Sequence, residues 1–228
     1  MTHPIYPYKP PRELAPNLWQ IRGSLPMPVP RNMTVHRLAD GRLALYSVVA
    51  MYEDGMRALE ALGEPAIMVI PHDRHHMDAP FYKARYPALR VLAPHSRAVR
   101  GVAIDGDISE LTGLGVKAYA VPGSSYHDVA LEVPLEGGGC ALVVCEILTN
   151  LDPPGGLMRV MFKLLGPPGG GFGVARAVRL REAVDRAGLG EWLAGLAARG
   201  DVRMVLVGHG DALLRKVSAE LLRAARQV

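Results

Sequence analysis

The chain has 228 residues, of which 49% are hydrophobic and 21% are charged, a composition that excludes a disordered protein and allows a substantial core. The formal net charge is +4, aromatic residues make up 6%, and lysines and arginines form no dense cluster, so no nucleic-acid partner is expected. No stretch of 18 uncharged apolar residues and no apolar signal core occur, which predicts a cytoplasmic protein without a membrane partner.

The first half of the chain alternates short strands with helices. Asp40-Gly41 lies between two alternating apolar runs, and an Asp-Gly dipeptide in this setting predicts a β-hairpin. A compact apolar run at 66–70 ends at Pro71 and leads into His72. The expected elements are an extended arm over 1–13, strands over 18–25, 33–38, 42–49, 66–70 and 90–93, and helices over 54–62 and 80–86.

The second half begins with strands and ends with helices. A hairpin is expected around the three glycines at 137–139, and Gly188 and Gly190 are candidate breaks in the long helical pattern before the last strand. Cys140 and Cys145 lie in one apolar run and are expected to be buried, without a disulfide framework. The expected elements are strands over 116–121, 129–133, 140–147 and 202–207, and helices over 174–198 and 212–226.

Residues 151–173 form an apolar segment between two hinges that are rich in glycine and proline. One interpretation is a flexible linker. The other is a lid, in which Met158, Met161, Phe162 and Leu165 cover a pocket or contact an apolar substrate. A segment this long and apolar needs a surface to bury against, and the sequence leaves both interpretations open.

The order of the expected elements predicts an α/β protein in which mixed sheets are covered by helices. The length suits one large domain or two small ones. We expect a single domain over residues 14–228, which follows the N-terminal arm and contains the insertion at about 151–173.

Polar residues of one chemical kind follow four of the expected strands. The loop after the strand at 66–70 holds three histidines and two aspartates within seven residues. Imidazole nitrogens and carboxylate oxygens are ligands that zinc and similar divalent metals accept. The candidates are His72, Asp73, His75, His76 and Asp78 in this loop, His127 and Asp128 after the Pro-Gly turn, Glu146 at a strand end, and His209 and Asp211 after the last strand.

If these strands share one direction in the sheets, their ends converge and the side chains form a metal site. A bound metal lowers the pKa of its water to about 7, which gives a hydroxide nucleophile at neutral pH. The alternative for the loop at 72–78 and for His127 is a solvated polar turn. For Glu146 the alternative is a carboxylate that faces water at a strand end.

The order of these motifs resembles the metallo-β-lactamase superfamily. An opening hairpin, a strand that runs into a histidine-rich loop, a Pro-Gly turn, a strand that ends in an acidic residue and a final strand that runs into Gly208-His209-Gly210 follow one another as in that family. The paired His75-His76 is similar to a branch of the superfamily whose loop carries His-His. The resemblance covers roughly residues 14–211 and implies an αββα sandwich of two mixed sheets flanked by helices.

The resemblance also implies a metal centre, usually zinc. Its ligands would be His72, His75, His76, His127, Glu146 and His209. Asp78 or Asp73 would orient or deprotonate the water. The family's usual loop is His-x-His-x-Asp-His, and this loop departs from it, which favours one zinc ion over two and leaves iron or manganese open.

Two functions are therefore expected from the sequence. The first is a metal-dependent hydrolase that acts on an ester, thioester, amide or phosphodiester through a metal-bound water, with a small-molecule substrate. The second is a non-catalytic relative, which keeps the fold as a binding or scaffold protein with a degenerate metal site. The wealth of histidines and carboxylates favours the first, and the altered loop spacing favours the second. A homodimer is left open.

Overall fold

The computed structural model divides the chain into two compact units, Met1–Ala118 (unit 1) and Tyr119–Val228 (unit 2). Each unit has its own sheet and its own hydrophobic core. The residues that the structure describes are 3–25, 29–94, 99, 101–124, 128–151, 156–181 and 185–228, with the side chains of 157, 158, 161 and 181 left out. Within these residues, no helix has the length and hydropathy that a membrane span requires.

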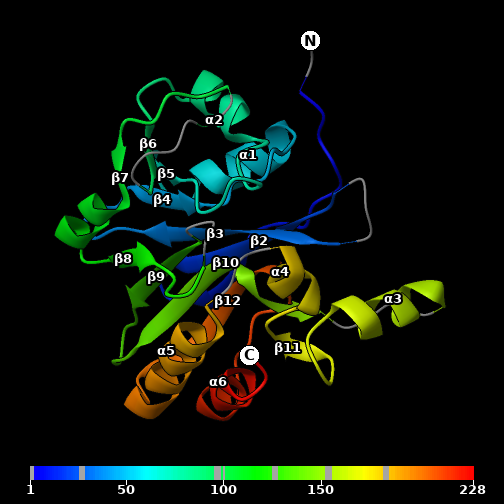
Figure 1. Ribbon diagram of the computed structural model, residues 1–228. Helices are drawn as coiled ribbons and strands as arrows, with labels where there is room; N and C mark the ends of the chain where they lie inside the picture. The colour runs from blue at the N-terminus through cyan, green and yellow to red at the C-terminus, as the bar shows by residue number, and fades with distance from the viewer. Residues whose placement is uncertain are drawn as a thin grey trace. The chain divides into compact units, whose positions relative to one another are not determined.

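Unit 1 is built on a seven-stranded sheet whose strands lie side by side in sequence order (Figure 1). The pairings from β1 to β4 are antiparallel and those from β4 to β7 are parallel, so the sheet is mixed. The strands are β1 (Arg12–Ala15), β2 (Leu18–Gly23), β3 (Arg31–Arg37), β4 (Leu43–Tyr46), β5 (Pro65–Val69), β6 (Arg90–Ala93) and β7 (Gly106–Asp107).

The hairpin between β3 and β4 forms where the Asp-Gly dipeptide predicts it. Gly41 has a φ of 85°, a left-handed conformation that glycine adopts without steric cost, and the register pairs His36 with Ala44. The alternating apolar residues of this hairpin, exemplified by Met33 and Leu45, are completely buried. The period-2 pattern of the sequence therefore fixes which face of the sheet forms the core.

Two helices, α1 (Glu53–Glu60) and α2 (Ala79–Arg85), lie on one face of the unit 1 sheet (Figure 1). Met56 and Leu59 of α1 and Tyr82 of α2 belong to the same buried cluster as the strands. A 3-10 helix, Ile108–Leu114, follows β7. Burial of these side chains supplies the core of unit 1.

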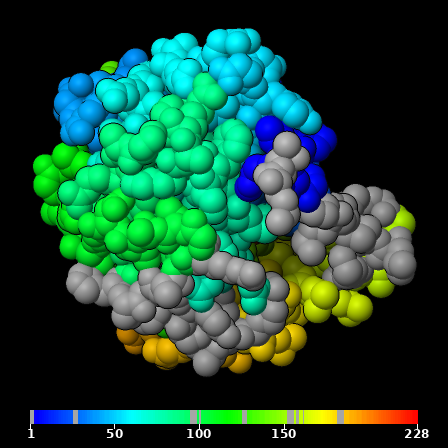
Figure 2. Space-filling model, turned by 90° about the horizontal axis from the view of Figure 1, so that it is seen from above, coloured from blue at the N-terminus to red at the C-terminus, as the bar shows by residue number. Residues whose placement is uncertain are grey.

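The described part of the predicted N-terminal arm packs against these helices, as the space-filling view of Figure 2 shows in dark blue beside cyan and green. The Tyr8 hydroxyl donates to Asp54 at 2.7 Å, and the His3 ring lies 5.4 Å from the ring of Phe81. The arm is thus part of unit 1, and its last residues enter β1.

Unit 2 is built on a second mixed sheet. Its central strand is buried over most of its length, pairs antiparallel with β9 and β11 and pairs parallel with β12. The strands are β8 (Lys117–Ala120), which begins two residues before the boundary of the unit, β9 (Val129–Pro134), the central β10 (Cys140–Leu151), β11 (Gly171–Gly173) and β12 (Val202–Gly210). The helices are α3 (Leu157–Leu165), α4 (Arg176–Arg181), α5 (Arg186–Arg199) and α6 (Val217–Ala225). Figure 1 shows α5 and α6 side by side against this sheet.

Two expected helix boundaries in unit 2 are wrong. The single helix expected over 174–198 is two helices, α4 and α5, and the candidate breaks Gly188 and Gly190 both lie inside α5. The Asp185 side chain accepts from the backbone N–H of Gly188 and caps the start of α5. The last helix begins at Val217 and not at 212, because Leu213 exchanges two backbone hydrogen bonds with Val205 of β12. The expected fold class, α/β with two mixed sheets and helices, is confirmed.

Candidate functional site

In unit 1, the candidate residues lie in the loop between β5 and α2. His72, His75 and Asp78 are buried, whereas Asp73 is exposed and His76 is partly exposed. The backbone N–H of His75 donates to the oxygen of His72 at 2.9 Å, which folds the loop into a tight turn. Three of the five polar candidates are thus turned into the protein and two are turned towards its surface.

His75 contacts a hydroxyl that the sequence analysis did not single out. Its Nδ1 lies 2.6 Å from Oγ of Ser47, which directly follows β4. Ser47 has a φ of 60°, and its N–H donates to the oxygen of Val69 at the end of β5. Because a hydroxyl engages Nδ1, Nε2 is the ring nitrogen of His75 that can serve as a metal ligand.

His72 and His76 make different contacts from His75. Nδ1 of His72 accepts from the backbone N–H of Arg74 at 3.2 Å, which places the proton of the neutral ring on Nε2. A ring nitrogen of His76 contacts the backbone oxygen of Asp73. These contacts tie both rings to the turn itself.

Asp78 has a role in unit 1 that the sequence did not indicate. It forms a buried ion pair with Arg31 of β3, accepts from the backbone N–H of Ala50 at 2.7 Å and lies 2.7 Å from Nε2 of His3. Both carboxylate oxygens therefore hold neighbouring segments of unit 1 together, which is how a buried carboxylate is compensated.

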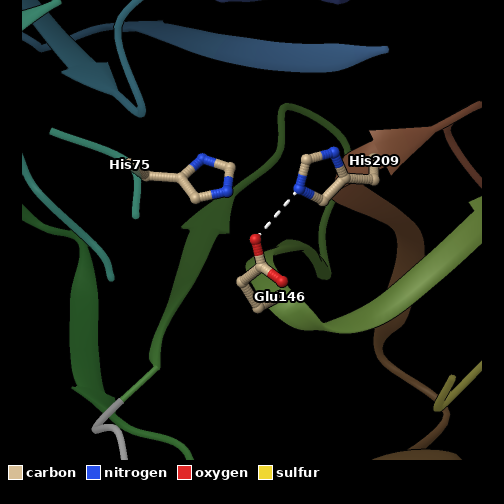
Figure 3. Close-up of side chains that lie close together, drawn as sticks. All are labelled: His75, Glu146 and His209. Atoms are coloured by element: carbon tan, nitrogen blue, oxygen red, sulfur yellow. Dashed lines mark hydrogen bonds and ion pairs between the residues drawn. The ribbon is translucent and has the colours of Figure 1, made fainter. Parts of the chain in front are cut away.

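In unit 2, Glu146 of β10 and His209 of β12 form a buried pair. His209 Nε2 lies 3.0 Å from Oε1 of Glu146, and both side chains are 10% exposed (Figure 3). The two residues are far apart in sequence, and the parallel pairing of β10 with β12 brings them together. Of the four polar groups expected to converge, these two side chains meet within unit 2, although both lie inside their strands, because β10 continues to Leu151 and β12 to Gly210.

A register shift between β10 and β12 creates this pair. Val144 pairs with Val207 and Thr149 pairs with His209, so residues 145–148 lie opposite Gly208 alone. A Cβ atom at Gly208 would lie 2.6 Å from the backbone oxygen of Cys145, closer than real side chains come. The glycine before His209 is therefore required for the close approach of the two strands.

The displaced segment of β10 is held by Asp128. Its Oδ2 accepts from the backbone N–H of Glu146 at 2.9 Å and from that of Ile147 at 2.7 Å, and the residue is completely buried. Asp128 thus positions Glu146 through its backbone. His127, the ligand expected beside it, lies outside the described residues.

Comparison with known proteins supports the fold independently. No family model and no curated protein matches the sequence. Among solved structures, the FIM-1 metallo-β-lactamase from Pseudomonas aeruginosa, in its mono-zinc form, is 13% identical with a TM-score of 0.64, and the match covers 99% of this chain and 98% of that one. The DIM-1 metallo-β-lactamase is 12% identical with a TM-score of 0.64 and 99% of both chains covered.

A third solved structure is the NDM_FIM-1-like metallo-β-lactamase from Erythrobacter litoralis in its mono-zinc form. It is 14% identical with a TM-score of 0.60, and the match covers 100% of both chains. These matches span both units, and at such low sequence identity they show a similarity of fold alone. The chain has the metallo-β-lactamase fold, as the order of its motifs predicts.

Proposed function

We propose that the protein is a metal-dependent hydrolase whose metal ligands include His75 of unit 1 and Glu146 and His209 of unit 2, the three side chains drawn in Figure 3. The proposal rests on the chemical composition and the burial of these three side chains. The set comprises two imidazoles and one carboxylate, all buried, which can each offer one ligand atom. The likeness of the whole chain to solved metallo-β-lactamases supports the grouping of ligands from both units.

The donor set fits a catalytic metal site better than a structural one. Structural zinc sites are closed by four protein ligands, whereas catalytic sites use three and keep a position open for water or substrate. Two histidines and one glutamate are one of the ligand sets that catalytic zinc uses. A zinc ion in this set would lower the pKa of its bound water to about 7 and so supply a nucleophile for hydrolysis.

Two further residues of the protein would hold the proposed metal ligands in position. Ser47 fixes the orientation of the His75 ring, and Asp128 fixes the backbone of Glu146. Of the two aspartates predicted to handle the water proton, Asp73 is exposed, whereas Asp78 already uses both oxygens within unit 1. We propose an ester, thioester, amide or phosphodiester as the substrate.

The same set of ligands is also used for another metal. Two histidines and one carboxylate bind non-haem Fe(II) in oxygenases. We favour a single zinc ion, because two of the matching metallo-β-lactamases are described in mono-zinc form. Iron and manganese are the competing metals.

The test is elemental analysis of protein purified without chelator. We expect about one equivalent of zinc in the wild-type protein, and its loss in His209→Ala and Glu146→Gln. The control is His36→Ala, since His36 lies in β3 and its Nδ1 contacts the backbone oxygen of Asn17. Absence of any stoichiometric metal, together with no change in stability on adding chelator, would refute the metal centre.

Activity is tested next, with ester, thioester, amide and phosphodiester reporter substrates. Turnover that disappears in His209→Ala and persists in His36→Ala is the expected result. Stoichiometric metal without turnover of any reporter would instead support the non-catalytic binding protein, which the altered loop spacing favours. Stoichiometric iron would replace the zinc assignment and redirect the search to redox substrates.

A further inference from the structure

Unit 2 contains a cavity that shares no residue with the proposed metal centre. It has a volume of about 310 Å³ and is lined by Arg176, Arg179 and Leu180 of α4 and by Arg186 at the start of α5. This volume is at the lower end of the range of small-molecule sites. Among the described residues, the cavity thus gathers three guanidinium groups.

Each of the three arginines is held in place by a backbone oxygen. Arg176 donates to Lys163 at 2.9 Å, and Arg179 donates to Gln227 at 2.8 Å. Arg186 donates through Nε to the oxygen of Val228 at 2.7 Å. A guanidinium group has five N–H donors, so these contacts orient the groups and, within the described part of the chain, leave donors for a ligand.

No Asp or Glu side chain neutralises these arginines among the residues that the structure describes. The neighbouring carboxylate, Asp185, accepts from the backbone of Gly188 at the start of α5. Elsewhere in unit 2, Arg199 pairs with both Glu132 and Asp201 at 2.8 Å. The arginines of the cavity therefore differ from Arg199, whose charge two carboxylates compensate.

The neighbouring positive charges affect the pKa of Arg179. Desolvation lowers its pKa, and the charges of Arg186 and Arg176 lower it further. Its Nε is buried and has no hydrogen-bond partner in the described part of the chain. By contrast, carboxylates raise the pKa of Arg199. An anion at the cavity would relieve the repulsion and take up the unused donors.

We propose that this cavity binds the phosphate group of a phosphorylated ligand. A phosphate monoester offers three acceptor oxygens and a charge of about −1.5 to −2 at neutral pH, which suits three guanidinium groups from separate segments. A carboxylate offers fewer oxygens and a single charge. Planar guanidinium groups bind phosphate oxygens in a bidentate manner, which lysine cannot do.

The surroundings of the cavity indicate that the ligand also has an apolar part. Leu180 lines the cavity and is 80% exposed. The contact of Arg176 with Lys163 joins the cavity to α3, on which Val160, Leu164 and Leu165 are exposed. The phosphate could belong to a free phosphorylated molecule or to a phospholipid headgroup, and the two sources share the recognition chemistry.

The first arm of the test uses calorimetric titration of the whole protein with hexyl phosphate, inorganic phosphate and hexanoate. We expect hexyl phosphate to bind more tightly than the other two, and its affinity to fall with rising salt. Arg179→Gln and Arg176→Gln should each weaken binding roughly tenfold, the loss typical of a charge-assisted hydrogen bond. Arg203 is an exposed residue of β12. Arg203→Gln removes the same charge and should leave the affinity for hexyl phosphate unchanged.

The second arm distinguishes the two sources of phosphate. Vesicles of phosphatidylcholine alone and of phosphatidylcholine mixed with phosphatidic acid are sedimented with the protein. Co-sedimentation with the phosphatidic acid vesicles alone, reduced in Arg179→Gln and Leu164→Ser, assigns the site to a headgroup. Hexyl phosphate binding without co-sedimentation assigns it to a soluble ligand.

Two results would overturn the proposal. One is the absence of binding to hexyl phosphate, inorganic phosphate and anionic vesicles. The other is equal loss of binding in Arg203→Gln, which would show a general charge effect. Urea unfolding of each variant verifies that it is folded, and Arg176→Gln, which removes only one contact with Lys163, serves if Arg179→Gln is unstable.

Discussion

The hydroxyl of Ser47 orients the ring of His75 and sets its tautomer. His75 is the ligand that unit 1 contributes to the proposed metal centre. Ser47 has a left-handed backbone conformation, with φ of 60°, which is uncommon for a residue with a side chain. This conformation directs Oγ to Nδ1 of His75 at 2.6 Å. Partners of this kind orient a metal-binding imidazole and fix its tautomer.

We predict that Ser47→Ala weakens zinc binding by about 10- to 100-fold, the usual cost of losing such a partner. Ser47→Gly lacks the hydroxyl too, but glycine adopts the left-handed conformation without steric cost. It should therefore lose affinity to the same extent while unfolding at a higher urea concentration than Ser47→Ala. Competition titration with a zinc-binding dye measures the affinity, and normal zinc affinity in both variants would show that Ser47 does not position His75.

The pairing of β10 with β12 is the element on which the unit 2 site depends. Gly210 ends β12 with φ of 102°, and a Cβ atom there would lie 1.9 Å from the backbone oxygen of Asn150. The glycines on both sides of His209 therefore allow β12 to approach β10 closely. The Gly-His-Gly motif is thus explained by the packing of these two strands.

We predict that Gly210→Ala destabilises the protein by at least about 2 kcal/mol, because it combines a forbidden contact with an unfavourable φ. The matched control is Gly195→Ala in α5, where a Cβ atom meets nothing within 4 Å. That change should stabilise the protein by about 0.5–1 kcal/mol, since alanine favours a helix over glycine. Urea unfolding compares the two, and similar midpoints for both variants would contradict the close approach at Gly210.

At the scale of the whole molecule, each unit contributes ligands to the proposed metal centre. His75 belongs to unit 1, whereas Glu146 and His209 belong to unit 2. Metal that binds only the folded protein stabilises it by mass action, by about 2.7 kcal/mol when free metal is 100 times its dissociation constant. Metal binding should therefore couple to the stability of the folded chain.

We predict that zinc raises the unfolding temperature of the wild-type protein and of His36→Ala. The rise should be lost in His75→Ala and in His209→Ala alike, because each removes one of three ligands from a different unit. Differential scanning calorimetry with and without zinc measures the effect. A full zinc-dependent rise in His75→Ala would limit the metal site to unit 2.

The sequence by itself determined most of the elements and the kind of chemistry. Hydrophobic alternation and the Asp-Gly turn located the β3–β4 hairpin, and the apolar run at 66–70 located β5 and the histidine loop after it. Local side-chain interactions decide such features, so they can be predicted from neighbouring residues. Glu146 and His209 were predicted because each is a polar residue that follows an apolar run in the sequence.

Only the tertiary structure decided which partners these residues have. Ser47 meets His75 because β4 and β5 are parallel neighbours, and Asp128 holds Glu146 across a register shift that no local pattern marks. The same holds for Asp78, whose charge and position suggested catalysis and whose partners, including Arg31, come from distant segments. Long-range register and burial set these contacts, and they depend on the packing of the whole chain rather than on the residues on either side.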